Sequence, residues 1–242
     1  MTSKKTLVAL QFDYENKSLK DNFKTLKRLM NRTSKDSIVL APELCLSGYK
    51  YDSLEKSAEF SKQILSELQE LSTCKTFALT LIEDINGNYY NNLKLFHDGK
   101  LIQTRSKAKL FPLGDEEKFF TSGNINDIDI VEVDGIKIAT LVCFELRFTE
   151  LWQQVKGADV ILVPSFWGKL RKAHLKTLCE ALAITNQAFV IVANSSDESM
   201  ASSSAIVTPF GDVYRDDSSF IVSHEVDLNE ITKMRRYINI GL

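Results

Sequence analysis

Residues 136–147 read IKIATLVCFELR, an apolar run of strand length that ends at Cys143 and continues toward a helical turn. Similar runs rich in Val, Ile and Phe recur along the chain, bounded by polar or turn residues as β-strands are. The predicted strands are 7–12, 37–40, 77–82, 93–96, 136–143, 160–163, 189–193, 205–207 and 220–226. The segments between these strands decide the fold class.

Helical periodicity fills several of the gaps between the strands. Apolar residues recur at spacings of three and four over residues 19–30, 57–71 and 175–188. Strands that interleave with helices favour an α/β fold. The turn residues Asn86-Gly87-Asn88 lie between two predicted strands and indicate a hairpin, so we expect a mixed sheet. Because no repeat or Pro/Gly-rich linker divides the chain, residues 1–242 are expected to form a single domain.

Composition excludes several classes of protein. The 242 residues carry a formal net charge of −2, which gives no general attraction to nucleic acid or to an anionic membrane. No apolar run approaches the roughly 20 residues that span a bilayer, and the N-terminus lacks the pattern of a signal peptide. The cysteines show no CxxC spacing, so neither a zinc site nor a disulfide framework is expected. These features predict a cytoplasmic protein with free thiols.

Three polar residues stand at or near the ends of apolar runs. Cys143 follows Ile138–Val142, Glu43 follows the strand 37–40 in Ala-Pro-Glu, and Lys107 lies in Ser-Lys-Ala-Lys. Taken alone, the cysteine is a typical small buried residue and the two charges are typical of a surface. A cysteine at a strand-to-helix turn, however, can meet helix-N-terminal amides that lower its pKa and hold an oxyanion.

In combination, the three segments resemble the nitrilase superfamily of carbon–nitrogen hydrolases. The family has a glutamate in a P-E-x-x-x-x-G-Y context, which Glu43 and Tyr49 match. Its lysine stands in K-x-H-L-F-P, which Lys107 matches with Lys109 in place of histidine. Its cysteine stands in C-Y-D/E-L-R-F-x-E, which the segment beginning at Cys143 matches with phenylalanine for tyrosine. The order and the separations of the three motifs also agree with the family.

Further matches extend the resemblance over nearly the whole chain. The stretch Asp115 to Gly123 is similar to D-E-x-x-Y-F-x-x-G, which supplies a second active-site glutamate, here Glu116. Residues 174–187 resemble the family helix H-W-x-x-L…A-R-A-I-E-N-Q, with three departures. These departures are Leu175 for tryptophan, Leu182 for arginine and Thr185 for glutamate. We interpret the last two as the joint loss of an ion pair, which lowers stability less than removing one partner and leaving the other unpaired.

The resemblance implies a four-layer α-β-β-α sandwich with mixed sheets and cysteine-dependent hydrolysis of a small amide. Cys143 would attack the carbonyl, Glu43 would carry the protons, and Lys107 would hold the oxyanion with the backbone N–H of Phe144. Glu116 would orient the substrate or the lysine. The residues assigned to substrate binding are Phe144, Tyr49 and Trp167. No metal or organic cofactor is expected.

The substrate is predicted to be a small linear amide, because the C-F-E-L-R-F sequence and the short chain look most like the omega-amidase-like branch. Its substrates are monoamides of dicarboxylic acids, and the second carboxylate would need a cation. Lys169, Arg171 and Lys172 are the candidates, whereas Arg147 is interpreted as part of a structural ion pair. The alternatives are a nitrilase, an N-carbamoyl amine hydrolase, or a catalytically silent binding protein with this fold.

A homodimer, or a larger assembly of dimers, is also predicted. In the family, sheets commonly pair partly through the helix that follows the cysteine, here around residues 148–155. Phe148, Leu151, Trp152 and Val155 are spaced to lie on one face of that helix. The alternative is that this face packs inside its own subunit.

Overall fold

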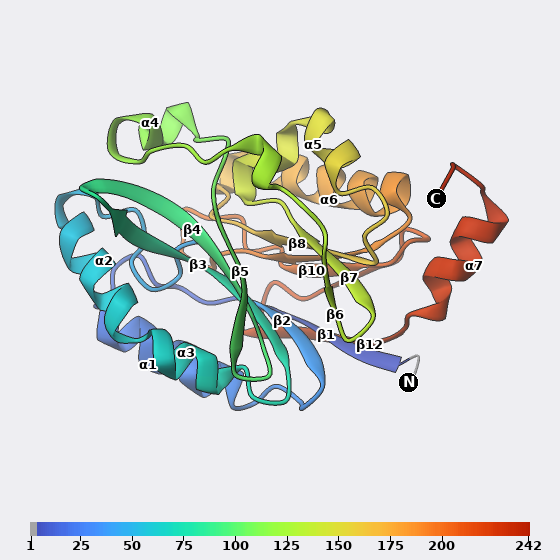
Figure 1. Cartoon of the computed structure of the whole chain (residues 1–242), viewed down its shortest axis with the longest axis horizontal. Coiled ribbons are helices and arrows are strands. Elements are labelled where there is room, and N and C mark those ends of the chain that lie inside the picture. Colours follow the sequence, from blue (N-terminus) through green and yellow to red (C-terminus); the bar gives the residue numbers. More distant parts are fainter. Residues whose placement is uncertain (1–3) are drawn as a thin grey trace.

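The computed structural model describes residues 4–242 and consists of two six-stranded sheets stacked face to face, with helices on both outer sides (Figure 1). In order across the first sheet the strands are β12 (Ile221–Asp227), β1 (Lys4–Leu10), β2 (Ser37–Leu40), β3 (Thr76–Ile85), β4 (Asn88–His97) and β5 (Lys100–Ser106). Across the second they are β11 (Val213–Arg215), β10 (Ala205–Val207), β9 (Phe189–Ala193), β8 (Val160–Pro164), β7 (Ile136–Thr140) and β6 (Val131–Val133). The predicted α-β-β-α sandwich is confirmed.

Both sheets are mixed, as predicted, and they share one plan. Three neighbouring strands run parallel in each, β1, β2 and β3 in the first sheet and β7, β8 and β9 in the second. The remaining strands pair antiparallel at the edges. Since the carboxyl ends of parallel strands meet at one edge of a sheet, the loops that follow β2, β7 and β8 can be brought together.

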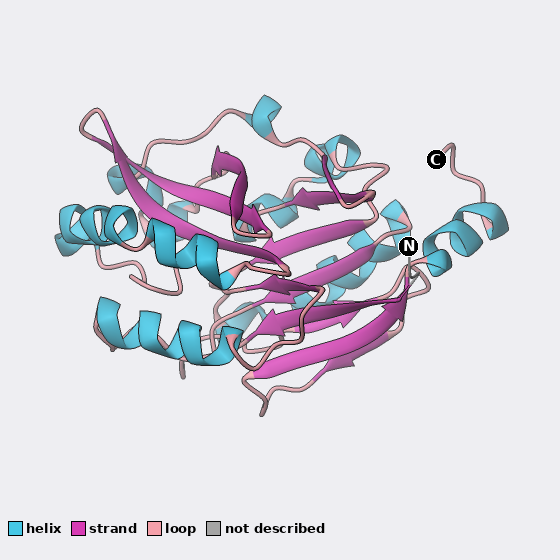
Figure 2. Ribbon diagram, turned by 60° about the horizontal axis from the view of Figure 1, so that its bottom comes forward, coloured by secondary structure: helices cyan, strands magenta, loops and turns pink. Residues whose placement is uncertain are grey.

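Helices cover the outer face of each sheet (Figure 2). The first sheet carries α1 (Leu19–Met30), α2 (Leu54–Gln63) and α3 (Leu65–Leu71), and the second carries α5 (Thr149–Gln154) and α6 (Lys172–Asn186). The short α4 (Glu116–Phe119) lies near the ends of the strands, and α7 (Asn229–Tyr237) lies at the opposite end of the molecule, near the C-terminus (Figure 1). Single 3₁₀ turns occur at Tyr51–Ser53, Pro112–Gly114, Ile125–Asp127, Cys143–Arg147 and Lys169–Arg171.

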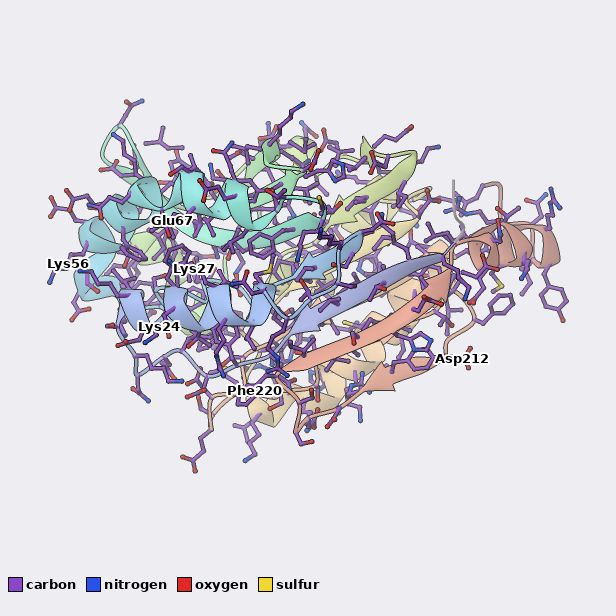
Figure 3. The ribbon with its side chains drawn as sticks, turned by 90° about the horizontal axis from the view of Figure 1, so that it is seen from below. Lys24, Lys27, Lys56, Glu67, Asp212 and Phe220 are labelled. Carbon is purple, nitrogen blue, oxygen red and sulfur yellow. The ribbon has the colours of Figure 1, made fainter. Side chains whose placement is uncertain are left out.

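The helix α1 shows why these segments fold as they do. Ser18 caps it by accepting a hydrogen bond from the backbone N–H of Asp21, which satisfies one of the free N–H groups of the first turn. Its buried face packs on the first sheet, and its outer face reaches α3 through an ion pair between Lys27 and Glu67 at 2.8 Å (Figure 3). Such an exposed pair contributes little stability, so the buried face holds the helix in place.

The four layers follow from the period of the strands. In β1, Leu7 and Ala9 face the second sheet, whereas Val8 and Leu10 belong to the cluster under α1. Because both faces of the strand are covered, all four side chains are buried and the sequence is continuously apolar. The predicted hairpin is confirmed too, since β3 and β4 pair antiparallel around a turn at Asn86 and Gly87 with positive φ.

The structure differs from the predicted elements in missed strands, in one divided helix and in the end of one strand. The strands β5, β6 and β11 were not predicted, because they are short or polar and have an exposed face. The helix predicted over 57–71 is two helices that meet at Ile64. The strand predicted over 136–143 ends at Thr140, three residues before the cysteine.

Two of the three residues that depart from the family helix are buried within the fold. Leu175 and Leu182 are fully buried on α6, and the Thr185 hydroxyl donates to the carbonyl of Ala181 in the same helix. On α5, three of the four residues predicted to contact a second subunit are buried within the protein itself, namely Leu151, Trp152 and Val155. The interface argument from this face is therefore wrong, and the homodimer stays a prediction.

Within residues 4–242 no helix has the length and apolar character needed to cross a membrane.

Candidate active site

The predicted catalytic residues come from both sheets and meet at one edge of the sandwich. Glu43 lies three residues beyond β2 and Lys107 directly follows β5, so both belong to the first sheet. Cys143 lies three residues beyond β7 of the second sheet. Glu116 arrives on α4. The site is therefore formed only when the two sheets pack together.

Lys107 is the centre of this group. Its Nζ lies 2.8 Å from Glu43 Oε1 and 2.8 Å from Glu116 Oε2, and the lysine is completely buried. Burial alone would lower the pKa of Lys107, but the two neighbouring carboxylates outweigh it and raise the pKa above its ordinary value. Burial likewise raises the pKa of Glu116, against the charge of Lys107. A lysine held in this way stays cationic and can stabilise developing negative charge.

A close approach of the backbone fixes the segment that carries Lys107. Its N–H donates to the carbonyl of Asn91 and its carbonyl accepts from the N–H of Gly123, both at 2.8 Å. A Cβ atom at position 123 would lie 2.4 Å from the carbonyl oxygen of Ser106, so only glycine fits there. Close packing therefore explains why glycine stands at the end of the stretch that resembles D-E-x-x-Y-F-x-x-G.

Glu43 is held on both carboxylate oxygens. Oε1 accepts from Asn91 Nδ2 at 2.9 Å in addition to Lys107, and Oε2 accepts from the backbone N–H of Phe166 at 3.1 Å. The backbone carbonyl of Glu43 accepts from the hydroxyl of Tyr14 at 2.6 Å. These contacts leave the carboxylate one fixed orientation, as a proton carrier requires.

Cys143 begins a five-residue 3₁₀ turn rather than an α-helix, and its φ of +46° lies in the left-handed region. Such a conformation costs about 1–3 kcal/mol in a residue with a side chain and must be held by its surroundings. Burial, reinforced by the charge of Glu43, raises the pKa of the thiol, although Lys107 and the N–H of Phe166 act in the opposite direction. Desolvation therefore outweighs the lowering of the thiol pKa that backbone amides at such a turn can produce.

The pocket at Cys143 has two parts. One is lined by Phe111, Cys143, Phe144, Arg147, Phe166, Trp167 and Arg171. The other also reaches Cys143 and is lined by Tyr49, Tyr51, Phe111, Gly114, Glu116, Phe166, Gly168, Arg171 and Met200. The Arg171 guanidinium lies 5.3 Å from the ring centre of Phe111, and both residues line both parts. All three predicted substrate-binding residues therefore line the pocket, and Cys143, which is 8% exposed, lines both parts.

Two arginines in this pocket have no acidic partner among residues 4–242. Arg147 lies 4.6 Å above the ring of Trp167 and contacts His174, and Arg171 lies over Phe111. Burial and the charge of Arg171 lower the pKa of Arg147, because the two cations face the same space. The interpretation of Arg147 as part of a structural ion pair is therefore wrong. An anionic group bound between the two guanidinium groups would relieve their repulsion.

The other predicted cations lie elsewhere. Lys172 forms an ion pair with Asp217 at 2.5 Å. Lys169 lines a separate hollow with Glu15 and Asp197 and is exposed to solvent. Lys109, which replaces the usual histidine, lies 4.6 Å over the ring of Phe148. Of the three loop cations, only Arg171 lines the pocket at Cys143.

Sequence reasoning missed residues that act through their neighbours. Asn91 was not among the predicted site residues, yet it donates to Glu43. Phe166 contributes a backbone N–H, which no side-chain pattern could indicate. Glu145 accepts hydrogen bonds from Arg105 and from two backbone N–H groups around the catalytic segments. A glutamate two residues after the cysteine, inside an apolar segment, was the available signal that it is buried and paired.

A buried thiol, a carboxylate and a lysine at the strand ends of an α-β-β-α sandwich define a cysteine hydrolase of the nitrilase type. The chain belongs to the carbon–nitrogen hydrolase family, whose model matches residues 7–236. It is 31% identical over 251 residues to the 2-oxoglutaramate amidase of Bacillus subtilis, covering 97% of this chain and 95% of the relative. The predicted family and the predicted enzyme class, an amidase acting on non-peptide carbon–nitrogen bonds, are confirmed.

Solved structures agree with this fold. Saccharomyces cerevisiae Nit3, a member of branch 10 of the nitrilase superfamily, has a TM-score of 0.84 at 23% identity over 99% of this chain and 96% of its own. A CN-hydrolase superfamily protein of Xanthomonas campestris has a TM-score of 0.85 at 20% identity, over 96% of this chain and 94% of its own. At these identities the likeness concerns the sandwich.

Proposed function

We propose that the protein hydrolyses the terminal amide of a small linear substrate whose other end is a carboxylate, with Cys143 as the nucleophile. The observation that carries this proposal is the pocket itself. Cys143 lines it, the charges of Glu43 and Lys107 act on the thiol, and two arginines without acidic partners among residues 4–242 line it too. An amide and a carboxylate a few bonds apart would satisfy both ends of this pocket.

In the first half of the reaction, the neutral thiol of Cys143 gives its proton to Glu43 as sulfur bonds to the amide carbon. The charge that develops on the carbonyl oxygen is held by Lys107 and by the N–H of Phe144, which is the second residue of the 3₁₀ turn and so has no acceptor within it. The C–N bond then breaks, and ammonia leaves with the proton that Glu43 returns. A thioester to Cys143 remains.

In the second half, Glu43 removes a proton from a water molecule as the water oxygen bonds to the thioester carbon. The C–S bond breaks, the sulfur regains a proton from Glu43, and the carboxylic acid product is released. Glu116 touches only Lys107 among these groups, so its part is to hold the lysine and to keep it charged.

The two arginines support the choice of substrate. A carboxylate between Arg147 and Arg171 would receive charge-assisted hydrogen bonds from both guanidinium groups, which are stronger than neutral ones. The Bacillus relative is named for an amide of a dicarboxylic acid, which fits this reading. The indole N–H of Trp167 already donates to the carbonyl of Arg171, so it is not free to bind the substrate. Trp167 would therefore act through its ring, which supports the guanidinium of Arg147.

A substrate panel tests this proposal. Succinamate and glutaramate are expected to release ammonia with a kcat/KM at least about 100-fold above that of butyramide, which lacks the carboxylate. Arg171→Met should raise KM for succinamate by about 10- to 100-fold and leave the rate with butyramide nearly unchanged. Lys169→Met, on the same loop but outside the pocket, is the control. Faster hydrolysis of butyramide or of a nitrile than of succinamate would overturn the assignment.

We further propose that residues 1–242 work as a single domain in the cytoplasm and form a homodimer. Support for the first comes from the core, since one apolar cluster contains residues of both sheets. All four cysteines are free thiols, which fits a reducing compartment. Light scattering at micromolar concentration tests the dimer, and a monomer alone would reject it.

A further inference from the structure

A buried carboxylate outside the catalytic group accepts hydrogen bonds from two separate segments of the chain. Glu145 is fully buried and lies two residues after Cys143. Its Oε1 accepts from Arg105 Nη1 at 3.0 Å and from the N–H of Ala108 at 2.7 Å. Its Oε2 accepts from Arg105 Nη2 at 2.7 Å and from the N–H of Val142 at 2.6 Å. Both oxygens are therefore bound from two sides.

The donors flank the two catalytic segments. Val142 immediately precedes Cys143, whereas Arg105 and Ala108 stand on either side of Lys107. Arg105 also donates to the carbonyl of Thr140, at the end of β7, at 2.7 Å. One carboxylate and one guanidinium thus join the strand end that carries the lysine to the turn that carries the cysteine.

This connection crosses between the sheets. The strand β5 belongs to the first sheet and β7 to the second, so no ladder of backbone hydrogen bonds sets the distance between them. Packed sheets meet through side chains, and apolar contacts are not directional. Bidentate hydrogen bonds between Arg105 and Glu145 are directional and fix both position and angle.

We propose that Glu145, held by Arg105, is a positioning residue that sets Cys143 against Lys107; this rests on the proposed function of those two residues. Glu145 holds the N–H before the left-handed cysteine and so keeps the strained turn from relaxing. The thiol and the N–H of Phe144 lie on that turn. A shift of the turn displaces the nucleophile and one oxyanion donor relative to Lys107 in a single movement.

Glu145→Gln is the direct test. Glutamine keeps the shape but presents an NH2 group to donors that need an acceptor, so one side of the connection is lost. We expect kcat with succinamate to fall about 100-fold, as for a displacement of about 1 Å, while KM changes less than about threefold. The inhibition constant of the product succinate should also stay within about threefold, because Arg171 lies on a different loop and the Arg147 guanidinium, although its residue ends the turn, is held over the ring of Trp167.

The matched control is Asp159→Asn. Asp159 also joins two segments by accepting from an arginine, Arg235, and from a backbone N–H, that of Lys137, but it lies before β8 and away from the catalytic residues. We expect its replacement to lower the melting temperature and to leave kcat unchanged. The comparison separates a loss of stability, which both variants share, from a loss of catalytic geometry.

A second variant covers the case in which Glu145→Gln does not fold. Arg105→Lys keeps the charge but cannot bond two carboxylate oxygens and the Thr140 carbonyl in one plane, and we expect kcat to fall about 10-fold with KM unchanged. A kcat within twofold of the unchanged protein in a folded Glu145→Gln or Arg105→Lys variant would overturn the proposal. Turnover in Cys143→Ala would instead overturn the proposed function, so the two failures are distinct.

Discussion

Replacement of Cys143 by alanine is expected to abolish amide hydrolysis and to leave the fold intact. The thiol is the only group of the site that can form the thioester, so kcat should fall by at least about 10⁴-fold. Removing one buried sulfur atom costs about 1 kcal/mol of stability, too little to unfold the protein. Ammonia release from succinamate measures the first effect, and the melting curve followed by circular dichroism measures the second.

Cys179→Ala is the control for this experiment. Cys179 is also fully buried, on α6, and burial raises its pKa to about 12, so the chemical change is the same in a similar environment. It should keep its turnover. Turnover of the Cys143 variant at more than about a hundredth of the normal rate would mean that another nucleophile carries the reaction.

Lys107→Met is expected to cause the second large effect, on activity and stability together. The substitution leaves Glu43 and Glu116 buried side by side without the cation that both contact. Breaking a buried ion pair in this way costs about 3–5 kcal/mol. Loss of the oxyanion contact should also lower kcat by about 10²–10³-fold. Chemical denaturation and initial rates measure the two losses separately.

The stability loss in Lys107→Met should depend on pH in a defined direction. Burial already raises the pKa of Glu116 in the folded protein, and without the lysine it rises further. A carboxyl whose pKa is higher in the folded than in the unfolded state binds its proton more tightly when folded, so stability falls as pH rises above about 4.3, the unfolded value. The deficit against the unchanged protein should therefore be smaller at pH 5 than at pH 8.

The control for the lysine is Lys94→Met. Lys94 is also buried in the first sheet, and its Nζ lies 2.7 Å from Glu83 Oε2, but it is not part of the catalytic group. Its replacement should cost stability and keep kcat. An equal loss of kcat in both variants would show that the effect of Lys107→Met comes from a weakened sheet.

The continuous apolar runs predicted buried strands in a mixed α/β fold, and the resemblance to the family implied the four-layer sandwich. The bounds predicted for β2, β9 and β10 agree residue for residue with the structure. The strand β5 was missed because KLIQTRS is half exposed and carries charge at both ends. The end of β7 was placed three residues late, because Leu141 and Val142 are as apolar as the strand although they lie between the strand and the 3₁₀ turn.

At the site, local motifs predicted which groups meet, but not what their environment does to them. Glu43, Lys107, Glu116 and Cys143 do come together, and their catalytic roles remain our proposal. The raised thiol pKa could not be predicted, because it depends on burial by segments far away in the chain. The ion pair assigned to Arg147 was wrong for the same reason, since its actual neighbours are Trp167 and Arg171.

The two sheets are also almost separate in chain order. Strands β1 to β5 make up the first, strands β6 to β11 the second, and only β12 returns from the end of the chain to pair with β1. Most strand pairs can therefore form early, within each half, whereas the return of β12 and the docking of the halves involve the longest separations and come late. In a refolding experiment, catalytic activity should thus return after the secondary structure. The far-ultraviolet circular dichroism signal recovers first, and activity follows in a slower phase once the halves have docked.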